Sequence, residues 1–490
     1  MEPATWLRDP SHYPEQMTPL SATVWFEAVG LGLHDATRTL AAPFGGFRTR
    51  TELGWAYEGE LDPEWEHDPR VLREAALTLP ARWADTYRPR TWAITHELWE
   101  HRPELPPPTE AALLFDRMWE LVREQWTLHF LVVLPAQFAA ELFRDRYVEL
   151  YGDGDPLAPY RLLETPHADE AIDVLARRAR ELHVDHLVRD LAVEHALARL
   201  GESSPGRRWL RELGGYLDPV DGVGGRSRWH ELSLTREAEL PQLTLEAIRL
   251  ALAGGGPAAP QSTAEPVPAD LAELHAACAP AFELKESHTA HIDYPGLLAT
   301  REVLLGFGRR LAAEGALDAT GDVWLLPRTV LRAALTEELD LRAIVAEQRA
   351  ELARGLAEGP KPYLGEPPQD AERHATLEKF YGSGGGALMG AGASPGAVEG
   401  VARVVSGQAD FSRVQTGDIL VTTTTTPAWT PLFPSLAGLV TETGGILSHA
   451  AVVAREYGLP AVVGAAGATT AIKDGMRIRI DGTAGTIAIV

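Results

Sequence analysis

The sequence predicts a multidomain protein in which a mainly α-helical region is followed by a small α/β domain. Residues 111–150 and 169–200 carry apolar side chains at the three-to-four spacing of amphipathic helices. After residue 392 the pattern changes to short β-branched runs bounded by Gly, Pro and Asp. A glycine-rich stretch separates the two patterns, so we expect a domain boundary there.

Residues 1–381 are predicted to form one mainly helical domain. The helical pattern fills most of residues 1–253, with 169–200 expected as a charged helix or helix pair, and it resumes from 269. The stretch between the two parts, residues 254–268, has the Gly, Pro and Ala composition of a loop or linker. We therefore expect a helical domain that carries a long internal loop.

Residues 382–392 contain six glycines in eleven positions, a composition typical of flexible linkers. Such a stretch is either a passive tether or the hinge of a moving domain. Composition does not distinguish these alternatives, so the choice depends on the chemistry of residues 393–490.

Residues 393–490 are predicted to form a compact α/β domain. A helix is expected from about Ser448 to Tyr457, because Gly458 and then Pro460 follow as an ordinary helix stop. The β-branched runs predict short strands at residues 400–405, 418–422, 438–442, 461–464 and 476–490.

The charge of the chain argues against two classes of partner. A formal net charge of −24 disfavours binding to nucleic acid or to an anionic membrane surface. Residues 391–490 carry six Lys and Arg against seven Asp and Glu, so almost all of the net charge lies in residues 1–390. The best apolar run, Phe130 to Phe143, is too short to cross a bilayer, and the first ten residues do not resemble a signal peptide. We therefore expect a cytoplasmic protein.

The cysteine and the clustered histidines predict neither a disulfide nor a metal site. Cys278 is the only cysteine, and its apolar surroundings suit a small buried residue better than a nucleophile. His183, His186 and His195 lie on the charged helical stretch, but they provide fewer converging ligands than a metal requires. No metal site is therefore predicted.

His449 is the strongest candidate for a residue that performs chemistry. A strand is expected to end at Glu442, a Gly444-Gly445 turn follows, and Ser448 and His449 then open the predicted helix. The first turn of a helix presents N–H groups and the positive end of the helix dipole, which together stabilise an anion. A histidine there can hold a phosphoryl group on a ring nitrogen. Ser448 can cap the helix, hydrogen-bond a phosphoryl oxygen, or do both.

For His449 taken alone, a helix-start histidine without chemistry would be the simpler interpretation. The segment 441–464, however, resembles the phosphohistidine domain of phosphoenolpyruvate-utilising enzymes, a mobile domain with the pattern GG-x-x-SHAA-x-x-AR-x-x-G-x-P. The resemblance extends through ASPG (393–396), TTTPAWTPLF (424–433) and DGTAG (481–485). The matching positions are Gly444, Gly445, Ser448, His449, Ala450, Arg455, Gly458 and Pro460.

This resemblance implies roles for individual residues. His449 is implied to carry the phosphoryl group, and residues 382–392 are implied to be the hinge on which its domain swings. Thr443 is implied to support His449, and Arg455 to contact phosphate or to brace the loop. A structural salt bridge from Arg455 to Glu456 or another acid is the alternative.

The N-terminal region resembles, less specifically, the acceptor-binding regions of phenylphosphate synthase and rifampin phosphotransferase. The segments that carry this resemblance are WLRDPSHYPEQMTPLSATVW (6–25), KESHTAHIDYPGLLATREVLLGFGRRLAAEGAL (285–317), DVWLL (322–326) and PYLGEPP (362–368). Phenylphosphate synthase and its cresol-phosphorylating relatives phosphorylate an aromatic hydroxyl through a phosphohistidine, with the nucleotide-binding part on a separate chain.

The resemblance places an acceptor site in the helical domain. Transfer to a hydroxyl needs a base within hydrogen-bond reach of its proton, and His288 and Glu286 are the leading candidates, with His12 also open. Asp293 is expected to orient a histidine, while His291 does not match the pattern. From spacing alone, Glu286-x-His288 would be a polar loop without a role. Candidates for the positive charge that phosphoryl transfer needs are Lys285, Arg301 and Arg455.

The nucleotide is expected on a partner. The sequence contains no G-x-x-x-x-G-K-[ST] loop, no G-x-G-x-x-G after a strand and no kinase signature set. In the one-chain relatives an ATP-grasp domain precedes the acceptor domain, and this sequence begins at the acceptor domain. The resemblance therefore implies a split enzyme, with ATP and Mg²⁺ bound by an ATP-grasp subunit and AMP and phosphate as co-products.

We therefore predict a dikinase-type phosphotransferase subunit that acts on a phenol- or cresol-like hydroxyl. Eleven of the thirteen tryptophans lie in residues 1–230, which suits an aromatic acceptor pocket and ordinary core packing equally. A larger hydroxylated acceptor such as an antibiotic is the alternative within the same chemistry. A phosphoenolpyruvate synthase fragment is disfavoured, because the pyruvate-binding barrel follows the histidine domain in those enzymes. A non-catalytic binding module is disfavoured by the complete histidine pattern.

Overall fold

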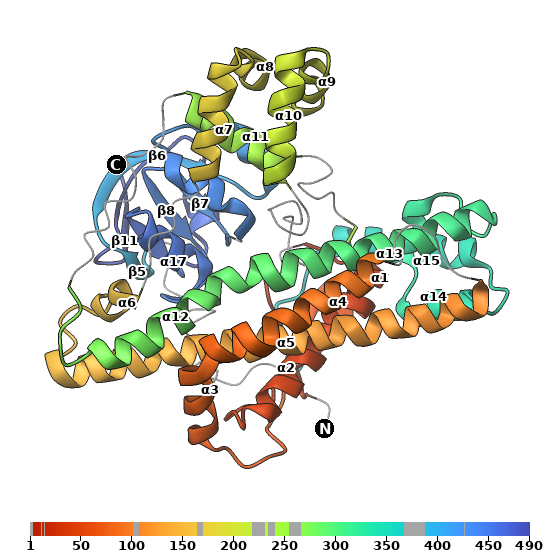
Figure 1. Cartoon of the computed structure of the whole chain (residues 1–490), viewed down its shortest axis with the longest axis horizontal. Helices are drawn as coiled ribbons and strands as arrows, with labels where there is room; N and C mark the ends of the chain where they lie inside the picture. The colour runs from red at the N-terminus through yellow and green to blue at the C-terminus, as the bar shows by residue number, and fades with distance from the viewer. Residues whose placement is uncertain are drawn as a thin grey trace. The chain divides into compact units, whose positions relative to one another are not determined.

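The chain folds into two compact units, one mainly helical and one containing the C-terminal sheet (Figure 1). The computed structural model describes residues 3–10, 12–13, 15–100, 107–163, 170–217, 231–233, 241–253, 266–366, 388–425 and 427–490. The first unit comprises Met1–Phe143, Trp229–Leu234 and Glu273–Ala371, and the second comprises Arg144–Arg228, Thr235–Ala272 and Glu372–Val490. The predicted class, a mainly helical region followed by an α/β domain, is confirmed.

The helices of the first unit surround one large apolar core, in which Trp25, Phe115 and Phe307 are almost fully buried. Their apolar positions recur at helical spacing, so each helix turns one face inward. In chain order the helical segments are α1 (Pro19–Ser21), η1 (Ala22–Phe26), α2 (Glu27–Thr39), α3 (Pro69–Arg82), η2 (Trp83–Tyr87), α4 (Arg88–Glu100), α5 (Pro108–Tyr151), α12 (Ala272–His288), η3 (Thr289–Asp293), α13 (Tyr294–Ala313), η4 (Thr320–Leu325), α14 (Arg328–Ala334) and α15 (Leu341–Glu358).

The long helix α5 is the central element of this core. Among the helices that the structure describes, only this one, over Thr109–Tyr151, is long and apolar enough to cross a membrane. However, 61% of its most apolar stretch is buried inside the protein. Such burial is typical of the core helix of a globular domain. The residues of α5 beyond Phe143 belong to the second unit.

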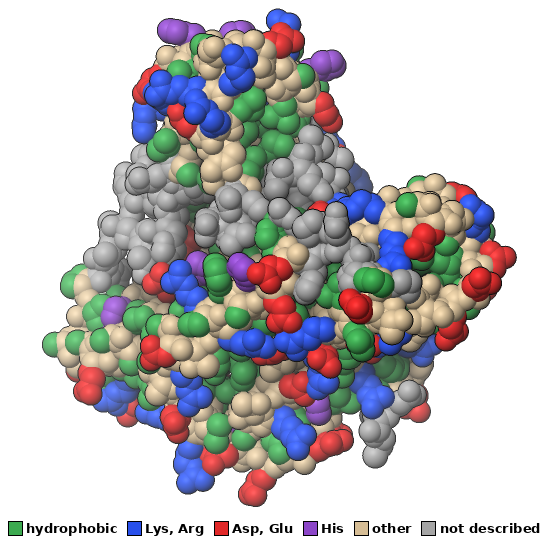
Figure 2. Space-filling view, turned by 45° about the vertical axis from the view of Figure 1, so that its right-hand side comes forward, with side chains coloured by type: hydrophobic (Ala, Val, Ile, Leu, Met, Phe, Trp, Pro, Cys, Tyr) green, Lys and Arg blue, Asp and Glu red, His purple; other side chains and the backbone are tan. Residues whose placement is uncertain are grey.

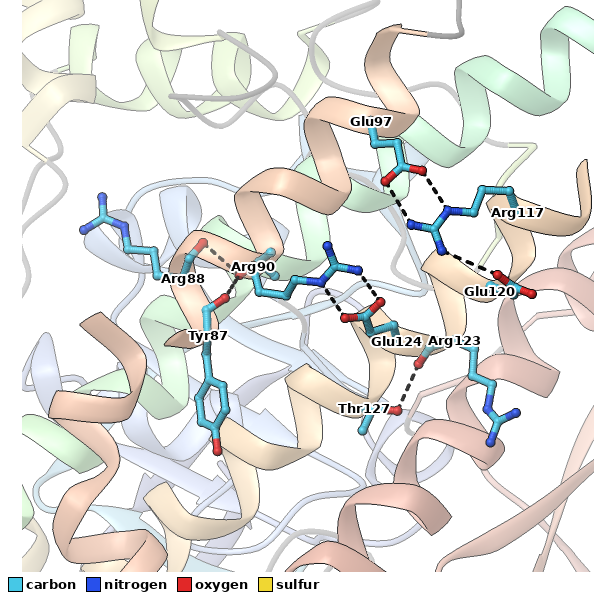
Figure 3. Close-up of polar contacts among 10 residues, drawn as sticks. Tyr87, Arg88, Arg90, Glu97, Arg117, Glu120, Arg123, Glu124 and Thr127 are labelled. Atoms are coloured by element: carbon cyan, nitrogen blue, oxygen red, sulfur yellow. Dashed lines mark hydrogen bonds and ion pairs between the residues drawn. The ribbon is translucent and has the colours of Figure 1, made fainter. Parts of the chain in front are cut away.

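Ion pairs join α4 to α5 on their polar faces (Figure 3). Arg90 forms a two-pronged pair with Glu124, with both N···O distances at 2.6 Å. Arg117 forms a second such pair with Glu97, at 2.7 and 3.1 Å. These side chains are partly exposed, so each pair is worth at most about 1 kcal/mol. Acidic and basic side chains are interspersed on the face drawn in Figure 2.

The first unit also contains a four-stranded antiparallel sheet in the order β2-β3-β1-β4. The strands are β1 (Thr5–Arg8), β2 (Phe47–Glu52), β3 (Trp55–Glu60) and β4 (Tyr363–Gly365). Trp6, Trp55 and Tyr57 form its small apolar cluster. Sequence analysis did not predict this sheet, because its strands are short and β4 pairs with a strand more than 350 residues away.

The helical part of the second unit is a small bundle around the buried Trp209. Its helices are α7 (Glu170–Glu181), α8 (Asp185–Asp190), α9 (Val193–Gly201), α10 (Ser204–Tyr216) and α11 (Gln242–Leu252). Helix α6 (Ala158–Leu163) belongs to the same unit but not to this apolar cluster. The stretch 169–200, expected as a helix or helix pair, is divided into α7, α8 and α9. The break after α7 falls at His183, which has a left-handed φ of 57°.

The C-terminal sheet has seven strands in the order β11-β10-β6-β7-β8-β9-β5, and β6 to β9 are parallel. The strands are β5 (Ala391–Ser394), β6 (Ala397–Val404), β7 (Ile419–Thr422), β8 (Gly438–Thr441), β9 (Ala461–Val463), β10 (Arg477–Asp481) and β11 (Thr486–Ile489). All five predicted strand regions are confirmed. Residues 382–387 of the predicted hinge lie outside the described residues, and Ala391 and Gly392 belong to β5.

Both faces of this sheet are covered, as the continuous apolar runs of its parallel strands predict. In β7, Leu420 faces one apolar cluster while Ile419 and Val421 face the other. The short helices are η5 (Gln408–Arg413), η6 (Pro427–Ser435), α17 (His449–Glu456) and α18 (Ala468–Ala471). Helix α17 ends as predicted: Gly458 has a φ of 61°, and the Leu459 N–H donates back to the Ala454 carbonyl at 2.8 Å.

Candidate active site

His449 is the first residue of α17, at the point where the chain returns from the end of strand β8. Its side chain is partly exposed. The ring Nε2 lies 3.4 Å from the hydroxyl of Thr430 in η6, and the ring centroid is 6.4 Å from that of Phe433. The imidazole of His449 therefore lies between the start of α17 and η6, with its Nε2 next to the hydroxyl of Thr430.

The glycine loop before His449 has a conformation that only glycine adopts easily. Gly444 has a φ of 99°, and a Cβ atom there would lie 2.8 Å from Ser448 Oγ and 3.0 Å from Ser448 Cβ. The Gly445 carbonyl accepts a 3.0 Å hydrogen bond from the Ser448 N–H. The loop is therefore folded tightly against Ser448, and this fixes where α17 begins.

Ser448 does not cap the helix through its side chain. Its backbone is extended, with φ −66° and ψ 158°, but no hydrogen bond from its hydroxyl closes the first turn. The hydroxyl is buried and has no hydrogen-bond partner among the described residues. A buried hydroxyl without a partner costs stability. The capping alternative for Ser448 is therefore wrong, and the hydroxyl is available to an oxygen atom held at His449.

Thr443 and Arg455 brace the loop from both sides. The Thr443 hydroxyl and N–H both donate to the Thr423 carbonyl, at 2.9 and 3.0 Å. Arg455 is buried, and its Nη1 donates to the carbonyls of Ala393 and Ile446 at 2.9 and 2.8 Å. Ile446 lies within the loop, so the bracing alternative for Arg455 matches these contacts.

A second group of candidate residues lies in the first unit, around a π-helical turn. The segments α12, η3 and α13 follow one another without a break, and the Tyr294 N–H donates to the Thr289 carbonyl five residues earlier. Turns of this kind often occur at functional sites. The Ile292 carbonyl accepts a 2.7 Å hydrogen bond from Gln125 of α5. A Cβ at Gly296 would lie 2.0 Å from the same Gln125 amide, so glycine allows α5 to approach.

This approach brings His129, His288 and Asp293 together in the core. His129 lies one helical turn after Gln125, and its Nδ1 is 2.8 Å from Asp293 Oδ1. His288 Nε2 is 3.5 Å from Asp293 Oδ2, and the two imidazole centroids are 4.7 Å apart. The three side chains are at most 6% exposed. The expectation that Asp293 orients a histidine therefore agrees with the geometry, and the histidine it bonds most closely is His129.

The charges in this group shift two pKa values. Burial by itself raises the pKa of Asp293, but the nearby His129 and His288 outweigh it and hold the pKa well below its usual range. Burial lowers the pKa of His129, an effect that Asp293 only partly offsets. The carboxylate is therefore ionised and the His129 ring neutral near neutral pH.

His12 forms a separate pair with Asp9. His12 Nδ1 lies 2.6 Å from Asp9 Oδ2, and the His12 N–H donates to the other carboxylate oxygen at 3.2 Å. Burial opposes protonation, but Asp9 and the charge of Glu58 outweigh burial and raise the pKa of His12. The His12 side chain is 39% exposed, unlike the two core histidines.

The remaining predicted acceptor residues lie along the same run of helix. Lys285, which is buried, places its Nζ 2.6 Å from Glu286 Oε1, so these two residues form an ion pair. Arg301, also buried, lies in α13, with its Nη1 3.3 Å from Glu302 Oε1. His291 is exposed and lies against Trp83.

Cys278 is buried, and burial raises the pKa of its thiol to about 11, which suits the predicted inert residue.

Sequence reasoning missed His129 and Asp9. His129 lies in the apolar helix 111–150, where a single histidine looks like an ordinary core residue, and its partner Asp293 is 164 residues away. Asp9 had a local signal, because Asp9-x-x-His12 is a spacing at which a carboxylate reaches back to an imidazole.

Comparisons with known proteins identify the C-terminal domain. Residues 414–485 match the family described as PEP-utilising enzyme, mobile domain. Rifampicin phosphotransferase of Streptomyces sviceus is 42% identical over 194 residues, which are 39% of this chain and 21% of that protein. A probable phosphoenolpyruvate synthase of Archaeoglobus fulgidus is 48% identical over 100 residues, which are 20% of this chain and 13% of that protein.

One relative matches nearly the whole chain. Chondramide synthase cmdD of Chondromyces crocatus is 27% identical over 547 residues, which are 99% of this chain and 14% of that protein. The chain thus spans 13% to 21% of the length of these three relatives. The glycine loop, Ser448 and the helix-start position of His449 all lie within residues 414–485, the region that matches the PEP-utilising mobile domain, so the C-terminal domain is a mobile domain of this kind.

Proposed function

We propose that this chain carries a phosphoryl group on His449 and transfers it to the hydroxyl of an aromatic acceptor bound in the first unit. The observation that supports this most strongly is the arrangement at the start of α17. There the imidazole of His449 follows a buried Ser448 hydroxyl that has no hydrogen-bond partner in the described structure. Helix N–H groups and a hydroxyl are the donors that bind phosphoryl oxygens.

In the first half-reaction, a ring nitrogen of His449 attacks the β-phosphorus of ATP. The N–P bond forms as the bond to AMP breaks, and water removes the terminal phosphoryl group as inorganic phosphate. ATP and Mg²⁺ are proposed to lie on a partner ATP-grasp subunit. The placement of ATP on a partner is supported by the sequence, which lacks the common nucleotide-binding motifs.

In the second half-reaction, the acceptor oxygen attacks phosphorus, the N–P bond breaks, and the imidazole of His449 is released from phosphorus as a neutral ring. The hydroxyl proton needs a base, and His12 suits this role best among the candidates. The Asp9 carboxylate can only accept, so in the neutral ring His12 Nδ1 carries the proton and Nε2 is the atom that would take up the proton of the hydroxyl. The alternatives are engaged elsewhere, because Glu286 is paired with Lys285 and His288 Nε2 faces Asp293.

The aromatic class of the acceptor is supported by the rings beside the core histidines. Phe130 is partly exposed, and its ring centroid lies 4.7 Å from that of His129, which also contacts Trp126. A larger hydroxylated natural product is the second candidate. It is favoured by the similarity to rifampicin phosphotransferase and, over the whole chain, to chondramide synthase.

The test is to incubate the full chain with ATP, Mg²⁺ and an ATP-grasp protein encoded beside it, and to measure intact mass under alkaline conditions. We expect a gain of one acid-labile phosphoryl group that needs the partner. His449→Ala should abolish the gain, whereas His195→Ala, which removes an exposed histidine in α9, should not. Phenols and larger aromatic alcohols are then added, and loss of the mass gain with formation of a phosphate ester identifies the acceptor. A wild-type chain that stays unmodified with a competent partner contradicts the proposal.

A further inference from the structure

The buried group formed by His129, His288 and Asp293 has a property that the proposed transfer does not use. One ligand atom from each residue lies within 4.8 Å of the other two, and the three side chains are at most 6% exposed. His129 comes from α5, whereas His288 and Asp293 come from the continuous run of α12 and η3, so two segments far apart in the sequence converge on one point.

The two ring nitrogens of His288 face different groups. His288 Nδ1 lies 3.0 Å from the Leu284 carbonyl, which can only accept, so Nδ1 carries the ring proton. Nε2 is therefore the ring atom that can act as a metal ligand. This atom faces Asp293 Oδ2 at 3.5 Å, and that oxygen has no hydrogen-bond partner among the residues described.

A buried carboxylate oxygen without a hydrogen-bond partner among the described residues is a candidate ligand for a cation. The 3.5 Å separation is long for a charge-assisted hydrogen bond, which is about 2.7–2.9 Å. It is close to the spacing of about 3.3 Å between two ligand atoms on a tetrahedral Zn²⁺ with bonds of about 2.0–2.1 Å. The separation therefore fits two ligand atoms on one metal ion.

The outer contacts of the group also suit a metal. A histidine that binds a metal usually donates its other ring N–H to a carbonyl or carboxylate, as His288 does to Leu284. Two imidazoles and one carboxylate form the three-ligand set of many catalytic zinc sites. The Trp126 and Phe130 rings against His129 provide an apolar surround.

We propose that His129, His288 and Asp293 bind one divalent transition-metal ion of the Zn²⁺ type. This site is separate from the Mg²⁺ expected with ATP on the partner. When bound, such an ion would supply positive charge to the acceptor side of the protein. Metal binding by these residues does not depend on phosphorylation of His449, so this proposal and the proposed function fail independently.

The experiment uses the full chain after dialysis against a chelator. Zn²⁺ is titrated by calorimetry, and Co²⁺ is added to a second sample and followed by visible absorption. We expect one ion per chain, a raised melting temperature, and an absorption band of four-coordinate Co²⁺ without the near-ultraviolet band of a thiolate ligand. The cobalt spectrum of the unchanged protein tests the proposal even if a variant fails to fold.

Variants then assign the ligands. His288→Ala and Asp293→Ala should each weaken Zn²⁺ binding by more than about 100-fold, the upper end of what changes in outer-shell residues cost. The matched control is the double variant His186→Ala, His195→Ala, which removes histidines from the second unit and should bind as wild type. The proposal is overturned if the folded wild type binds no ion at about 0.1 mM Zn²⁺, which is far above the dissociation constants that correspond to zinc-binding free energies of about 10–16 kcal/mol, or if both ligand variants bind as tightly as wild type. An imidazolium proton on His288, seen by NMR in the metal-free protein, would then explain the geometry.

Discussion

The side-chain amide of Gln125 donates a 2.7 Å hydrogen bond to the backbone carbonyl of Ile292, and this bond joins α5 to the π-helical turn η3. Gln125 lies one helical turn before His129 in α5, and Ile292 is the residue directly before Asp293. The contact therefore sets the distance across which the two side chains meet.

Replacing Gln125 with leucine should loosen this contact. The side chain is 2% exposed, so the Ile292 carbonyl would be left buried without its partner, at a cost of about 1–3 kcal/mol. Chemical denaturation of wild type and Gln125→Leu measures this loss. Gln348→Leu, at a partly exposed glutamine in α15, is the control and should change stability by less than about 0.5 kcal/mol. Equal stabilities for Gln125→Leu and wild type would show that the bond does not hold α5 to η3.

Two helical glycines should respond in opposite directions to alanine. A Cβ at Gly32 in α2 would lie 2.6 Å from Trp126 Cβ and 2.7 Å from its backbone carbon, so Gly32→Ala should destabilise by about 1–3 kcal/mol. A Cβ at Gly214 in α10 meets nothing within 4 Å, so Gly214→Ala should stabilise by up to about 1 kcal/mol. Calorimetric melting of both variants checks the pair. A stable Gly32→Ala protein would mean that α2 and α5 are not closely packed there.

The transfer step should depend on the protonation of His12. As a base it must be neutral, and its pKa is raised above the ordinary value of 6.5, so the transfer rate should increase with pH through a midpoint above 6.5. Asp9→Asn removes the main charge that raises this pKa, so the midpoint should move to lower pH. The measurement is the single-turnover rate of loss of phosphohistidine to the acceptor between pH 5 and 9. A midpoint that stays in place or moves upward in Asp9→Asn contradicts the role of the pair.

Gly444→Ala should impair phosphorylation of His449 by more than about tenfold. The added Cβ meets Ser448 Oγ at 2.8 Å, and misplacing a reacting group by about 1 Å can cost 100-fold in rate. Gly475→Ala is a matched control, because Gly475 has a similar φ of 82° but open space around its Cβ. Both variants carry backbone strain of about 1–2 kcal/mol. Normal phosphorylation of Gly444→Ala, measured by intact mass against time, would show that the close contact with Ser448 is not needed.

The α/β domain could be predicted from the sequence because its signals are local. The strand β7 is a continuous apolar run, and the end of α17 is set by Gly458, whose left-handed φ is the ordinary glycine stop. The position of His449 at a helix start follows from the same local pattern. The choice between the alternative roles of Ser448 and of Arg455 depended on contacts that only the structure shows.

The rest could not be predicted because it depends on contacts between distant residues. Strand β1 pairs with β4, which is more than 350 residues away in the sequence. No local pattern in the four residues of β1 indicates this pairing. His129 and Asp293 meet only because a π turn and Gly296 allow α5 to approach. The pair Asp9 and His12 is the exception, since its i,i+3 spacing was a local signal that sequence analysis did not use.

The central claim, that His449 carries the phosphoryl group, is tested most directly by locating the group in the chain. The full-length protein is phosphorylated with ATP, Mg²⁺ and the ATP-grasp partner, digested at alkaline pH, and sequenced by electron-transfer mass spectrometry. We predict a single phosphoryl group on His449, in the peptide that contains Ser448 and Arg455. A phosphoryl group on His12, on His288 or on any other residue, with His449 unmodified, would contradict it.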